Sequence, residues 1–288
     1  MEEIRQRIVE ELPDLLHGEI RTDSVTTSIY STDASLYEIE PLAVACPRSA
    51  TDVETLAAWA SDNEVPLIAR GAGTGLAGGA LGRGIVVDFS RHMTQVLELG
   101  SDFVRVQPGV IHSRLNSVLR QHGRCFAPAN SRTEVTTIGG MLAVDAAGSQ
   151  AFRVGSARDH LSELDCVLLG GQRITFSSHE PVSRQFAIRQ PVSSRVTEEA
   201  LRESGEHFLP PVYNETLSLS RLLPLSRRAD ILERLTAVLD ESAGDIHSLQ
   251  PMMLRNACGY MLRGVRRAES LDVTRLLAGS EGTLCLFT

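Results

Sequence analysis

The amino-acid sequence predicts an α+β protein, and three observations support this fold class. An apolar run at residues 42–46, a helical pattern after it and a second apolar run at residues 66–69 form a β-α-β unit, which requires at least two parallel strands. Apolar runs at residues 164–169 and 173–176 flank Gly170-Gly171, and this pair is the strongest hairpin signal in the chain. Residues 177 to about 250 are polar and then helical, so we expect a helical insertion there.

The first 37 residues are expected to form a helix followed by an arm. Apolar side chains occur at helical spacing in residues 1–16, at Ile4, Ile8, Leu12 and Leu15. The polar stretch that follows, through Ser35, is predicted to be an arm that leads into the domain. The helix of the β-α-β unit is predicted to begin at Thr51-Asp-Val-Glu54, because this segment has the form of a capping box.

Further elements follow along the chain. A third strand is predicted at residues 85–89, and residues 96–99 and 103–107 are expected to pair across the turn at 100–102. A helix is predicted from about Ile111 to His122. Leucine and isoleucine spacing predicts helices around residues 217–222 and 231–239. The run at 284–288 is strand-like, and we expect the natural polypeptide to continue beyond it.

Composition and charge narrow the class of partner. The chain has 288 residues, of which 42% are hydrophobic and 22% charged, and these fractions are typical of globular proteins. The net charge of −8 at pH 7 argues against a nucleic-acid-binding surface. No apolar run approaches the roughly 18 residues of a membrane span, and the acidic, amphipathic N-terminus differs from a secretory signal. We therefore expect a cytoplasmic protein.

The cysteines and histidines predict neither a disulfide framework nor a metal site. The five cysteines are odd in number and widely scattered, so buried thiols are expected. None of the eight histidines has a partner at the spacing of a metal-binding motif.

The most informative motif is a glycine-rich segment directly after the strand at residues 66–69. Between Arg70 and Ile85 lie Gly71, Gly73, Gly75, Gly78, Gly79, Gly82 and Gly84. Successive backbone N–H groups in such a loop can converge on a phosphate, so we interpret the segment as a diphosphate-binding loop. A glycine-rich connection without a ligand stays open as an alternative at this point.

Two other nucleotide-binding motifs are excluded by their context. Gly73-Thr-Gly75-Leu-Ala-Gly78 matches the dinucleotide fingerprint G-x-G-x-x-G, but that fingerprint begins a helix inside a β-α-β unit. The next strand starts at Ile85, which leaves too few residues for a helical crossover in a stretch so rich in glycine. A nucleotide P-loop needs Lys followed by Ser or Thr after the second glycine, and neither is present.

Two more loops share this character. Thr136-Thr-Ile-Gly-Gly140 places two hydroxyl side chains and two glycines before a small-residue run at 143–148, against which a flat ring can pack. Gly279-Ser-Glu-Gly-Thr283 is a third tight, polar loop. One extended ligand that touches all three loops would explain their common composition.

The order of these loops resembles the PCMH-type FAD-binding domain of the vanillyl-alcohol oxidase and p-cresol methylhydroxylase superfamily. The branch it resembles contains the FAD-linked D-lactate, glycolate and D-2-hydroxyglutarate dehydrogenases. The matching segments are Tyr30–Ser35, Arg70–Gly75, Val106–Gly109, Thr137–Gly140, Val154–Ser156 with Asp159–Leu161, Asn256–Tyr260 and Gly279–Leu284. The resemblance implies that residues 38–288 form two α/β subdomains, one with a small parallel sheet and one with a larger mixed or antiparallel sheet.

The resemblance also implies which residues contact FAD. The diphosphate is expected on Arg70, Gly71, Ala72, Gly73, Thr74 and Gly75, and the flavin and diphosphate near Thr136, Thr137, Gly139 and Gly140. The ribityl and adenine portions are expected near Gly148, Ser149, Gly155 and Val167, and the other side of the site at Glu281 and Gly282. Asp145 is included as a flavin contact, although many relatives have Asn at this position. Because position 74 is Thr and no His lies between Arg70 and Gly84, non-covalent FAD is expected.

In the family that the chain resembles, hydride passes from C2 of a D-2-hydroxy acid to flavin N5 while a base takes the hydroxyl proton. The base and the carboxylate-binding residues are expected in a C-terminal substrate domain that this sequence lacks, so no catalytic residue is assigned. The Tyr30–Ser35 element and the insertion most resemble large bacterial proteins with an added iron–sulfur domain, which would accept the electrons. The alternatives are a flavin reductase of the UDP-sugar (cell-wall) type and a non-catalytic FAD-binding fragment.

Overall fold

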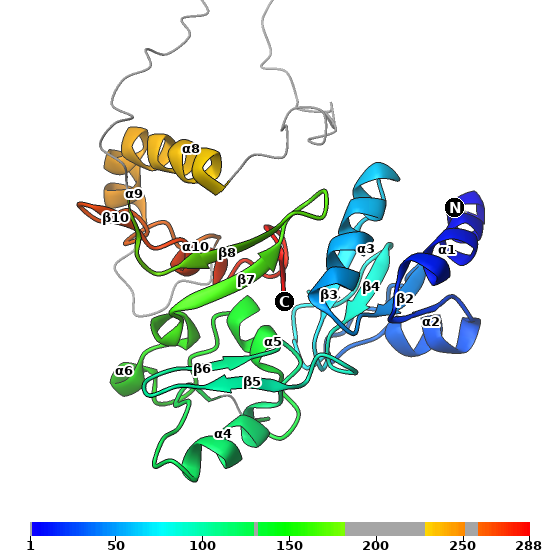
Figure 1. Cartoon of the computed structure of the whole chain (residues 1–288), viewed down its shortest axis with the longest axis horizontal. Helices are drawn as coiled ribbons and strands as arrows, with labels where there is room; N and C mark the ends of the chain where they lie inside the picture. The colour runs from blue at the N-terminus through cyan, green and yellow to red at the C-terminus, as the bar shows by residue number, and fades with distance from the viewer. Residues whose placement is uncertain (1, 130–131, 182–227, 251–258) are drawn as a thin grey trace, which may run out of the picture.

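The protein is described from a computed structural model that covers residues 2–129, 132–181, 228–250 and 259–288 (Figure 1). Its first sheet has the spatial order β1-β2-β4-β3. Strands β2, β4 and β3 are parallel, and β1 is antiparallel to β2. The bounds are Glu19–Arg21 for β1, Ala43–Cys46 for β2, Leu67–Arg70 for β3 and Ile85–Asp88 for β4. The predicted parallel β-α-β unit is therefore confirmed.

Two helices cover this first sheet. Helix α3 (Ala50–Asp62) connects β2 to β3, and helix α1 (Glu2–Leu15) packs nearby through Ile8 and Leu12. All four residues of β2 and of β4 are buried, as expected for central parallel strands. The N-terminal helix was predicted correctly from its apolar spacing.

The polar stretch after α1 is more ordered than the predicted arm. It contains the edge strand β1 and the short helix α2 (Ser24–Tyr30). Asp23 caps α2 by accepting a hydrogen bond from the Thr26 N–H at 2.9 Å. The arm interpretation was wrong because a three-residue strand and a seven-residue helix are too short to produce a readable periodicity.

The second sheet is antiparallel and has the order β11-β7-β8. Strands β7 (Glu163–Val167) and β8 (Arg173–Ser177) form the predicted hairpin, with positive φ at both Gly170 and Gly171. Strand β11 (Leu286–Phe287) lies on the other edge of β7. A separate hairpin joins β5 (Val96–Leu99) to β6 (Val104–Val106), as predicted.

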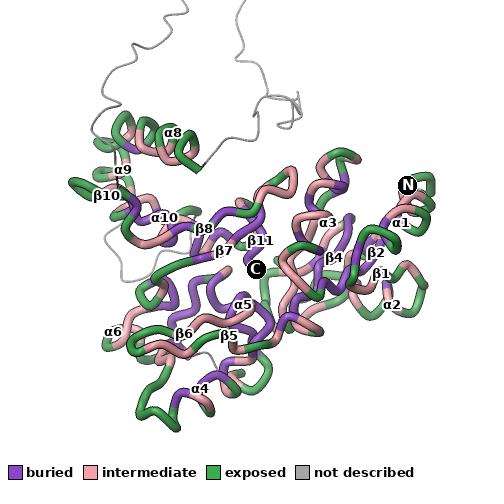
Figure 2. The backbone as a smooth tube through the Cα atoms, in the orientation of Figure 1, coloured by how far each residue is buried: buried purple, intermediate pink, exposed green. Residues whose placement is uncertain are grey.

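Helices surround the second sheet and complete a second core. These are α4 (His112–Arg120), α5 (Ile138–Ala143), the 3-10 helix η1 (Ala157–His160) and α10 (Val273–Leu277). Helix α6 (Ala151–Val154) has no buried residue and contributes no side chain to this core. Phe176 of β8, Met141 of α5 and Leu115 of α4 are fully buried in this core. Figure 2 shows buried backbone along β7 and β8. No described helix is long and apolar enough to cross a membrane.

The predicted insertion begins with a strand and contains two described helices. Strand β9 (Glu180–Pro181) pairs with β10 (Ser270–Leu271). Helices α8 (Arg228–Glu241) and α9 (Ala243–Leu249) follow, and Leu239 of α8 is buried in the second core. The helix predicted around residues 217–222 lies outside the described residues.

The N-cap of helix α3 lies two residues before the predicted cap, Thr51. This N-cap is Ser49, whose side chain accepts a hydrogen bond from the Asp52 N–H at 3.2 Å. Asp52 itself is buried and accepts hydrogen bonds from the N–H groups of His17 and Arg48. The prediction of Thr51 as the cap was wrong, because the exposed Thr51 already lies inside the helix.

A capping test distinguishes the two positions. Ser49→Ala is expected to lower the free energy of unfolding by about 1 kcal/mol, because one N-terminal N–H of α3 loses its acceptor. Thr51→Ala is the matched control and is expected to leave stability nearly unchanged. Urea unfolding followed by circular dichroism measures both, and a larger loss for Thr51→Ala would contradict the assignment of the cap.

Glu180 should make stability depend on pH. Burial acts to raise the pKa of its carboxyl group, but hydrogen bonds from Arg228 and the Ser177 N–H outweigh burial, so the pKa lies below its usual value of about 4.5. A carboxyl group with a lower pKa in the folded state stabilises the fold above the unfolded-state pKa, and this contribution is lost as the pH falls below it.

We therefore expect Glu180→Gln to flatten the dependence of the unfolding free energy on pH below about 4.5. Glu98→Gln, at an exposed position on β5, is the control and should keep the wild-type profile. The measurement is a series of urea titrations across this pH range, and identical slopes for the two variants would refute the assignment.

Candidate functional site

The three glycine loops line one cavity of about 570 Å³ between the first sheet and α5. Loop 1 (residues 70–75, after β3), loop 2 (residues 136–140, at the start of α5) and loop 3 (residues 279–283, between α10 and β11) each contribute to its wall. Of the predicted FAD contacts, the cavity lining contains Arg70, Gly71, Ala72, Gly73, Thr74, Gly75, Thr136, Thr137, Gly139, Gly140, Asp145, Glu281 and Gly282. Segments far apart in sequence are thus brought to a single site.

Four predicted contacts lie outside this lining. Gly148 packs against the backbone oxygen of Ala129, Ser149 is exposed, and Gly155 ends helix α6. Val167 is almost fully buried in the core beneath the first sheet. The structure therefore does not bring these four residues to the cavity.

The cavity also contains residues that the sequence had not singled out as contacts. Gly79 lies in the glycine-rich segment that follows loop 1, and Gly279 belongs to loop 3, so glycine composition was a usable signal at both positions. The apolar members Phe89, Pro108, Met141 and Phe287 carry no such signal, because a cavity wall and a protein core favour the same side chains.

Loop 1 contains backbone donors that no described acceptor uses. Among the described residues, the N–H groups of residues 71–76 donate no hydrogen bond, although this segment lines the cavity wall. Unpaired N–H groups in a glycine-rich turn form a partial positive charge suited to an anion. There is no helix between loop 1 and β4, as expected when the dinucleotide fingerprint was excluded.

The Arg70 side chain holds the segment that precedes β2. Its guanidinium group donates hydrogen bonds to the backbone oxygens of Tyr30 at 3.3 Å and Thr32 at 2.9 Å, and it lies 4.9 Å from the Tyr30 ring centre. The Ala34 N–H also donates to the Gly73 oxygen at 3.0 Å. The Tyr30–Ser35 element therefore supports loop 1 from outside the cavity.

Asp88 anchors the same element to β4. The Tyr30 hydroxyl donates to Asp88 at 2.5 Å, and the Ser90 N–H and hydroxyl donate to the other Asp88 oxygen. Burial and the Asp88 carboxylate raise the pKa of Tyr30 above its usual range, so this hydroxyl stays protonated and keeps donating. Burial, with Asp88 nearby, also raises the pKa of Cys46 to about 11, so that thiol is a weak nucleophile at neutral pH.

Loop 2 approaches loop 1 very closely. A Cβ atom added to Gly71 would lie 2.2 Å from the Thr137 Oγ1, so a larger residue at position 71 would force Thr137 or loop 1 to move. Thr137 is the N-cap of α5 and accepts a hydrogen bond from the Gly140 N–H at 3.3 Å. The Ile138 and Gly139 N–H groups donate to the backbone oxygens of Val110 and Pro108. The first N–H groups of α5 are thus already satisfied, and loop 1 supplies the free donors.

Loop 3 closes the other end of α5. The Gly279 and Glu281 N–H groups donate to the Leu142 and Ala143 oxygens, each at 2.9 Å. Glu281 has a φ of 53°, an unusual value for a residue with a side chain, and such strain is most often found at functional sites. A Cβ atom on Gly79 would lie 3.7 Å from the Glu281 carboxylate, so loop 3 also reaches the glycine-rich segment that follows loop 1.

A buried ion pair forms part of the cavity wall. The Arg158 Nε donates to Asp145 at 2.7 Å, and the Arg158 N–H donates to the other Asp145 oxygen at 3.0 Å. Both residues are at most 6% exposed. Arg158 also donates to the backbone oxygen of Arg275, in the helix before loop 3. Asp145 is therefore charge-compensated, and its carboxylate positions loop 3 through Arg158.

Among the described residues, no group of three or more His, Cys, Asp or Glu side chains is arranged to hold a metal ion. The Cys285 thiol lines the cavity, and a hydrogen bond with Cys166 together with burial raises its pKa above its usual range. The cavity is thus lined mainly by glycine, small and apolar residues, with backbone donors on one side. This combination fits the diphosphate and the flat ring system of a flavin dinucleotide.

The fold and the cavity define an FAD-binding domain, and the comparisons with known proteins agree. Residues 41–177 match the family described as FAD binding domain. Among solved structures, an alkyldihydroxyacetonephosphate synthase has a TM-score of 0.54 at 22% identity, over 59% of this chain and 35% of its own. The xylooligosaccharide oxidase of Myceliophthora thermophila has a TM-score of 0.53 at 22% identity, over 59% and 37%. At this identity the two structures establish the fold alone.

The curated relatives matched by sequence indicate a narrower class of protein than these two structures do. The D-2-hydroxyglutarate dehydrogenase of Pseudomonas putida is 32% identical over 93% of this chain, and that of Escherichia coli is 33% identical over 94%. The glycolate oxidase subunit GlcD of Bacillus subtilis is 33% identical over 51% of this chain and 32% of its own length. The chain spans 24% of the length of each of the two dehydrogenases.

The buried ion pair gives a testable stability difference. Arg158→Met is expected to lower the free energy of unfolding by about 3 kcal/mol, because it leaves the Asp145 carboxylate buried without a counter-charge. Adding Asp145→Asn should recover part of this loss, since Asn carries no charge and tolerates the positive φ of position 145. Chemical denaturation measures the free energy of unfolding of the wild type, of Arg158→Met and of the double variant.

Arg21→Met is the control, because Arg21 forms an exposed pair with Glu19 that solvent screens. It should leave stability nearly unchanged. An equal loss for Arg21→Met and Arg158→Met would show that the buried pair is not the source of the effect.

Proposed function

We propose that the chain is the FAD-binding part of a dehydrogenase that oxidises a D-2-hydroxy acid, with FAD bound non-covalently in the cavity. The observation that carries the proposal is the convergence of three glycine loops on one cavity of about 570 Å³. The substrate class is supported by the 32–33% identity to D-2-hydroxyglutarate dehydrogenases over 93–94% of the chain. D-2-Hydroxyglutarate is the first substrate to test, followed by glycolate and D-lactate.

In this proposal the backbone of loop 1 binds the FAD diphosphate. The N–H groups of residues 71–76 have no other acceptor among the described residues, so an anion satisfies them without displacing an existing hydrogen bond. Arg70 positions the loop by holding Tyr30 and Thr32. Thr137, Gly139 and Gly140 form the opposite wall, and Glu281 and Gly282 close it. Bound FAD supplies the electron acceptor, taking hydride from the substrate at N5.

A role for Gly148, Ser149, Gly155 and Val167 requires the adenine end of FAD to extend past this cavity. Asp145 remains in the proposal as part of the wall, with its charge balanced by Arg158. Non-covalent binding is supported by Thr74, which stands where some members of the family have a histidine attached to the flavin.

We propose that the substrate base and the carboxylate-binding groups come from another part of the longer protein. Among the described residues lining the cavity, the charged side chains are Arg70, Asp145 and Glu281. Arg70 and Asp145 are engaged with protein groups, which leaves Glu281 at the cavity edge. One acidic side chain cannot both bind a carboxylate and accept the hydroxyl proton.

An iron–sulfur domain as electron acceptor and a cytoplasmic location complete the proposal. The first rests on the resemblance of the Tyr30–Ser35 element and the insertion to large bacterial proteins with such a domain. The second is supported by the free thiols of Cys46, Cys125, Cys166 and Cys285, which are typical of a reducing compartment.

The cofactor test uses Gly71→Ala. The purified chain, incubated with FAD and desalted, is expected to show flavin absorption that is released on denaturation. Gly71→Ala should weaken FAD binding about tenfold or more, because the new methyl group forces loop 1 away from Thr137. Gly244→Ala on α9, where an added Cβ meets no atom within 4 Å, is the control and should bind FAD as the wild type does.

Two results would contradict the proposal. Absence of flavin absorption from the wild-type chain, at FAD concentrations that load a flavoprotein, would remove the cofactor assignment. Steady turnover of D-2-hydroxyglutarate by this chain alone, with an artificial electron acceptor, would show that it carries its own catalytic base.

A further inference from the structure

Arg70 is the only cationic side chain among the described residues that line the FAD cavity. Arginine commonly binds phosphate oxygens directly through its guanidinium group. In this structure, however, Nη1 and Nη2 of Arg70 donate hydrogen bonds to the backbone oxygens of Tyr30 and Thr32, neither of which lines the cavity. The partners of Arg70 therefore indicate a role other than direct binding of the diphosphate.

Thr32 belongs to a short turn, residues 31–39, which we call the bracing turn. Two contacts close this turn: the Ile39 N–H donates to the Ser31 oxygen at 2.8 Å, and Thr32 forms an isolated β-bridge with Glu38. Among the described residues that line the FAD cavity, none belongs to the bracing turn. The turn is therefore a closed structure on the outer side of loop 1.

The bracing turn contacts the glycine-rich segment at two glycines that have positive φ. The Ala34 N–H donates to the Gly73 oxygen at 3.0 Å, and Gly73 has a φ of 64°. A Cβ atom added to Gly73 would lie 2.8 Å from Arg70 Nη2. Gly78 has a φ of 77°, and a Cβ atom added there would lie 2.8 Å from the Tyr37 ring. Loop 1 and the segment after it therefore pack closely on Arg70 and on the bracing turn.

The hydrogen bond from Ala34 fixes the direction of one peptide group. The chain has no cis peptide bond among the described residues, and in a planar trans unit the C=O and the N–H point in opposite directions. The oxygen of the unit that joins Gly73 to Thr74 points toward Ala34, on the outer side of loop 1. The Thr74 N–H consequently points to the other side, toward the cavity that Thr74 lines, and no described residue accepts from it.

Tyr30 connects the bracing turn to the buried part of the first sheet. Its hydroxyl donates to the Asp88 carboxylate at 2.5 Å, and Asp88 is buried at the end of β4. The Arg70 guanidinium lies 4.9 Å from the centre of the Tyr30 ring and also donates to the backbone oxygen of Tyr30. A continuous series of contacts thus runs from Asp88 through Tyr30 and Arg70 to the bracing turn.

We propose that Arg70 and Tyr30 are positioning residues for the cofactor diphosphate. They hold the bracing turn, whose Ala34 N–H keeps the Thr74 N–H directed into the cavity. Arg70 acts through this turn and does not itself bind the diphosphate. Donors that are already fixed lose little conformational freedom when the anion binds, and this favours binding. The inference rests on the proposed binding of FAD and adds residues on the outer side of loop 1 that determine the affinity.

The guanidinium group makes this role specific to arginine. Two of its nitrogens bridge two carbonyl oxygens, whereas lysine carries the same charge on a single ammonium group. Arg70→Lys therefore separates the two possible roles of the side chain. If charge alone binds the diphosphate, this variant preserves the affinity for FAD, and if the bridge between carbonyls positions loop 1, the variant loses affinity.

The experiment compares Arg70→Lys and Arg70→Met with the wild-type chain. Flavin fluorescence gives the dissociation constant for FAD, and hydrogen exchange gives the opening of the Ala34 and Thr74 amides. Both variants are expected to bind FAD about tenfold more weakly or worse, and to exchange faster at Ala34, because its acceptor is no longer held in place. FAD should slow exchange at Thr74 in the wild type, and less so in both variants.

Tyr30→Phe is a milder variant, because it keeps Arg70 and removes only the hydrogen bond to Asp88. It is expected to weaken FAD binding about threefold or more. Arg21→Lys is the control variant, since Arg21 forms an exposed pair with Glu19, and it should bind FAD as the wild type does. Riboflavin is the control ligand, because it contains the flavin ring and lacks the diphosphate, so the variants should bind it with wild-type affinity.

Three results would overturn the inference. Wild-type affinity for FAD in Arg70→Lys would show that the bridge between carbonyls is not required. Equal losses of affinity for FAD and riboflavin would indicate a general loss of structure, and unchanged exchange at Ala34 would show that Arg70 does not hold the bracing turn. A wild-type chain that binds no FAD would instead refute the proposed function, and the exchange rate at Ala34 would still test the role of Arg70.

Discussion

The contact between Gly71 and Thr137 is the constraint on which the cavity depends. Gly71 belongs to the loop that leaves the first sheet, and Thr137 caps the helix that packs against the second sheet. With a Cβ-to-Oγ1 distance of 2.2 Å for any larger residue, this contact sets how closely the two halves approach. The same helix, α5, holds loop 3 through its final carbonyl groups. A six-residue helix therefore positions all three loops.

The distribution of polar groups around the cavity follows from this arrangement. The N-terminal N–H groups of α5 are used for capping and for contacts with Pro108 and Val110, so they are not available to a ligand. By contrast, the N–H groups of residues 71–76 have no acceptor within the described part of the chain, and unpaired backbone donors reduce stability unless water or a ligand accepts from them. Arg70 and Asp145 are each bound to protein groups. The site consequently favours an anion through backbone dipoles while its charged side chains hold the framework.

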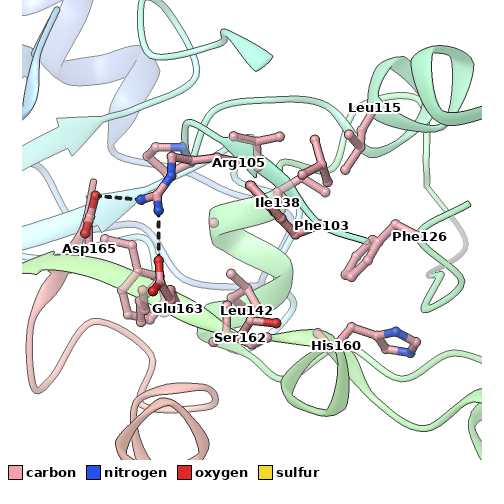
Figure 3. Close-up of a pocket in the computed structure, with 18 of the residues that line it drawn as sticks. Phe103, Arg105, Leu115, Phe126, Ile138, Leu142, His160, Ser162, Glu163 and Asp165 are labelled. Atoms are coloured by element: carbon pink, nitrogen blue, oxygen red, sulfur yellow. Dashed lines mark hydrogen bonds and ion pairs between the residues drawn. The ribbon is translucent and has the colours of Figure 1, made fainter. Parts of the chain in front are cut away.

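Helix α5 also separates two cavities. Pro108, Gly139 and Phe287 line both the FAD cavity and a second cavity of about 740 Å³ (Figure 3). Gly139 is packed against Pro108, where an added Cβ atom would lie 2.7 Å from the proline side chain.

The sequence by itself determined the elements whose signals are local. Apolar periodicity identified α1, the parallel β-α-β unit and the β5–β6 hairpin, and Gly170-Gly171 identified the β7–β8 turn. Each of these two signals, the periodicity and the glycine pair, depends on neighbouring residues alone. Glycine composition likewise identified the three loops. Thirteen of the predicted FAD contacts line one cavity. Only the tertiary structure decided that Ser49 caps α3, that the Arg70 side chain turns toward Tyr30, and that Gly148, Ser149, Gly155 and Val167 lie outside the cavity. These outcomes depend on which distant segments meet, and a linear pattern of residue types does not encode the distance between them.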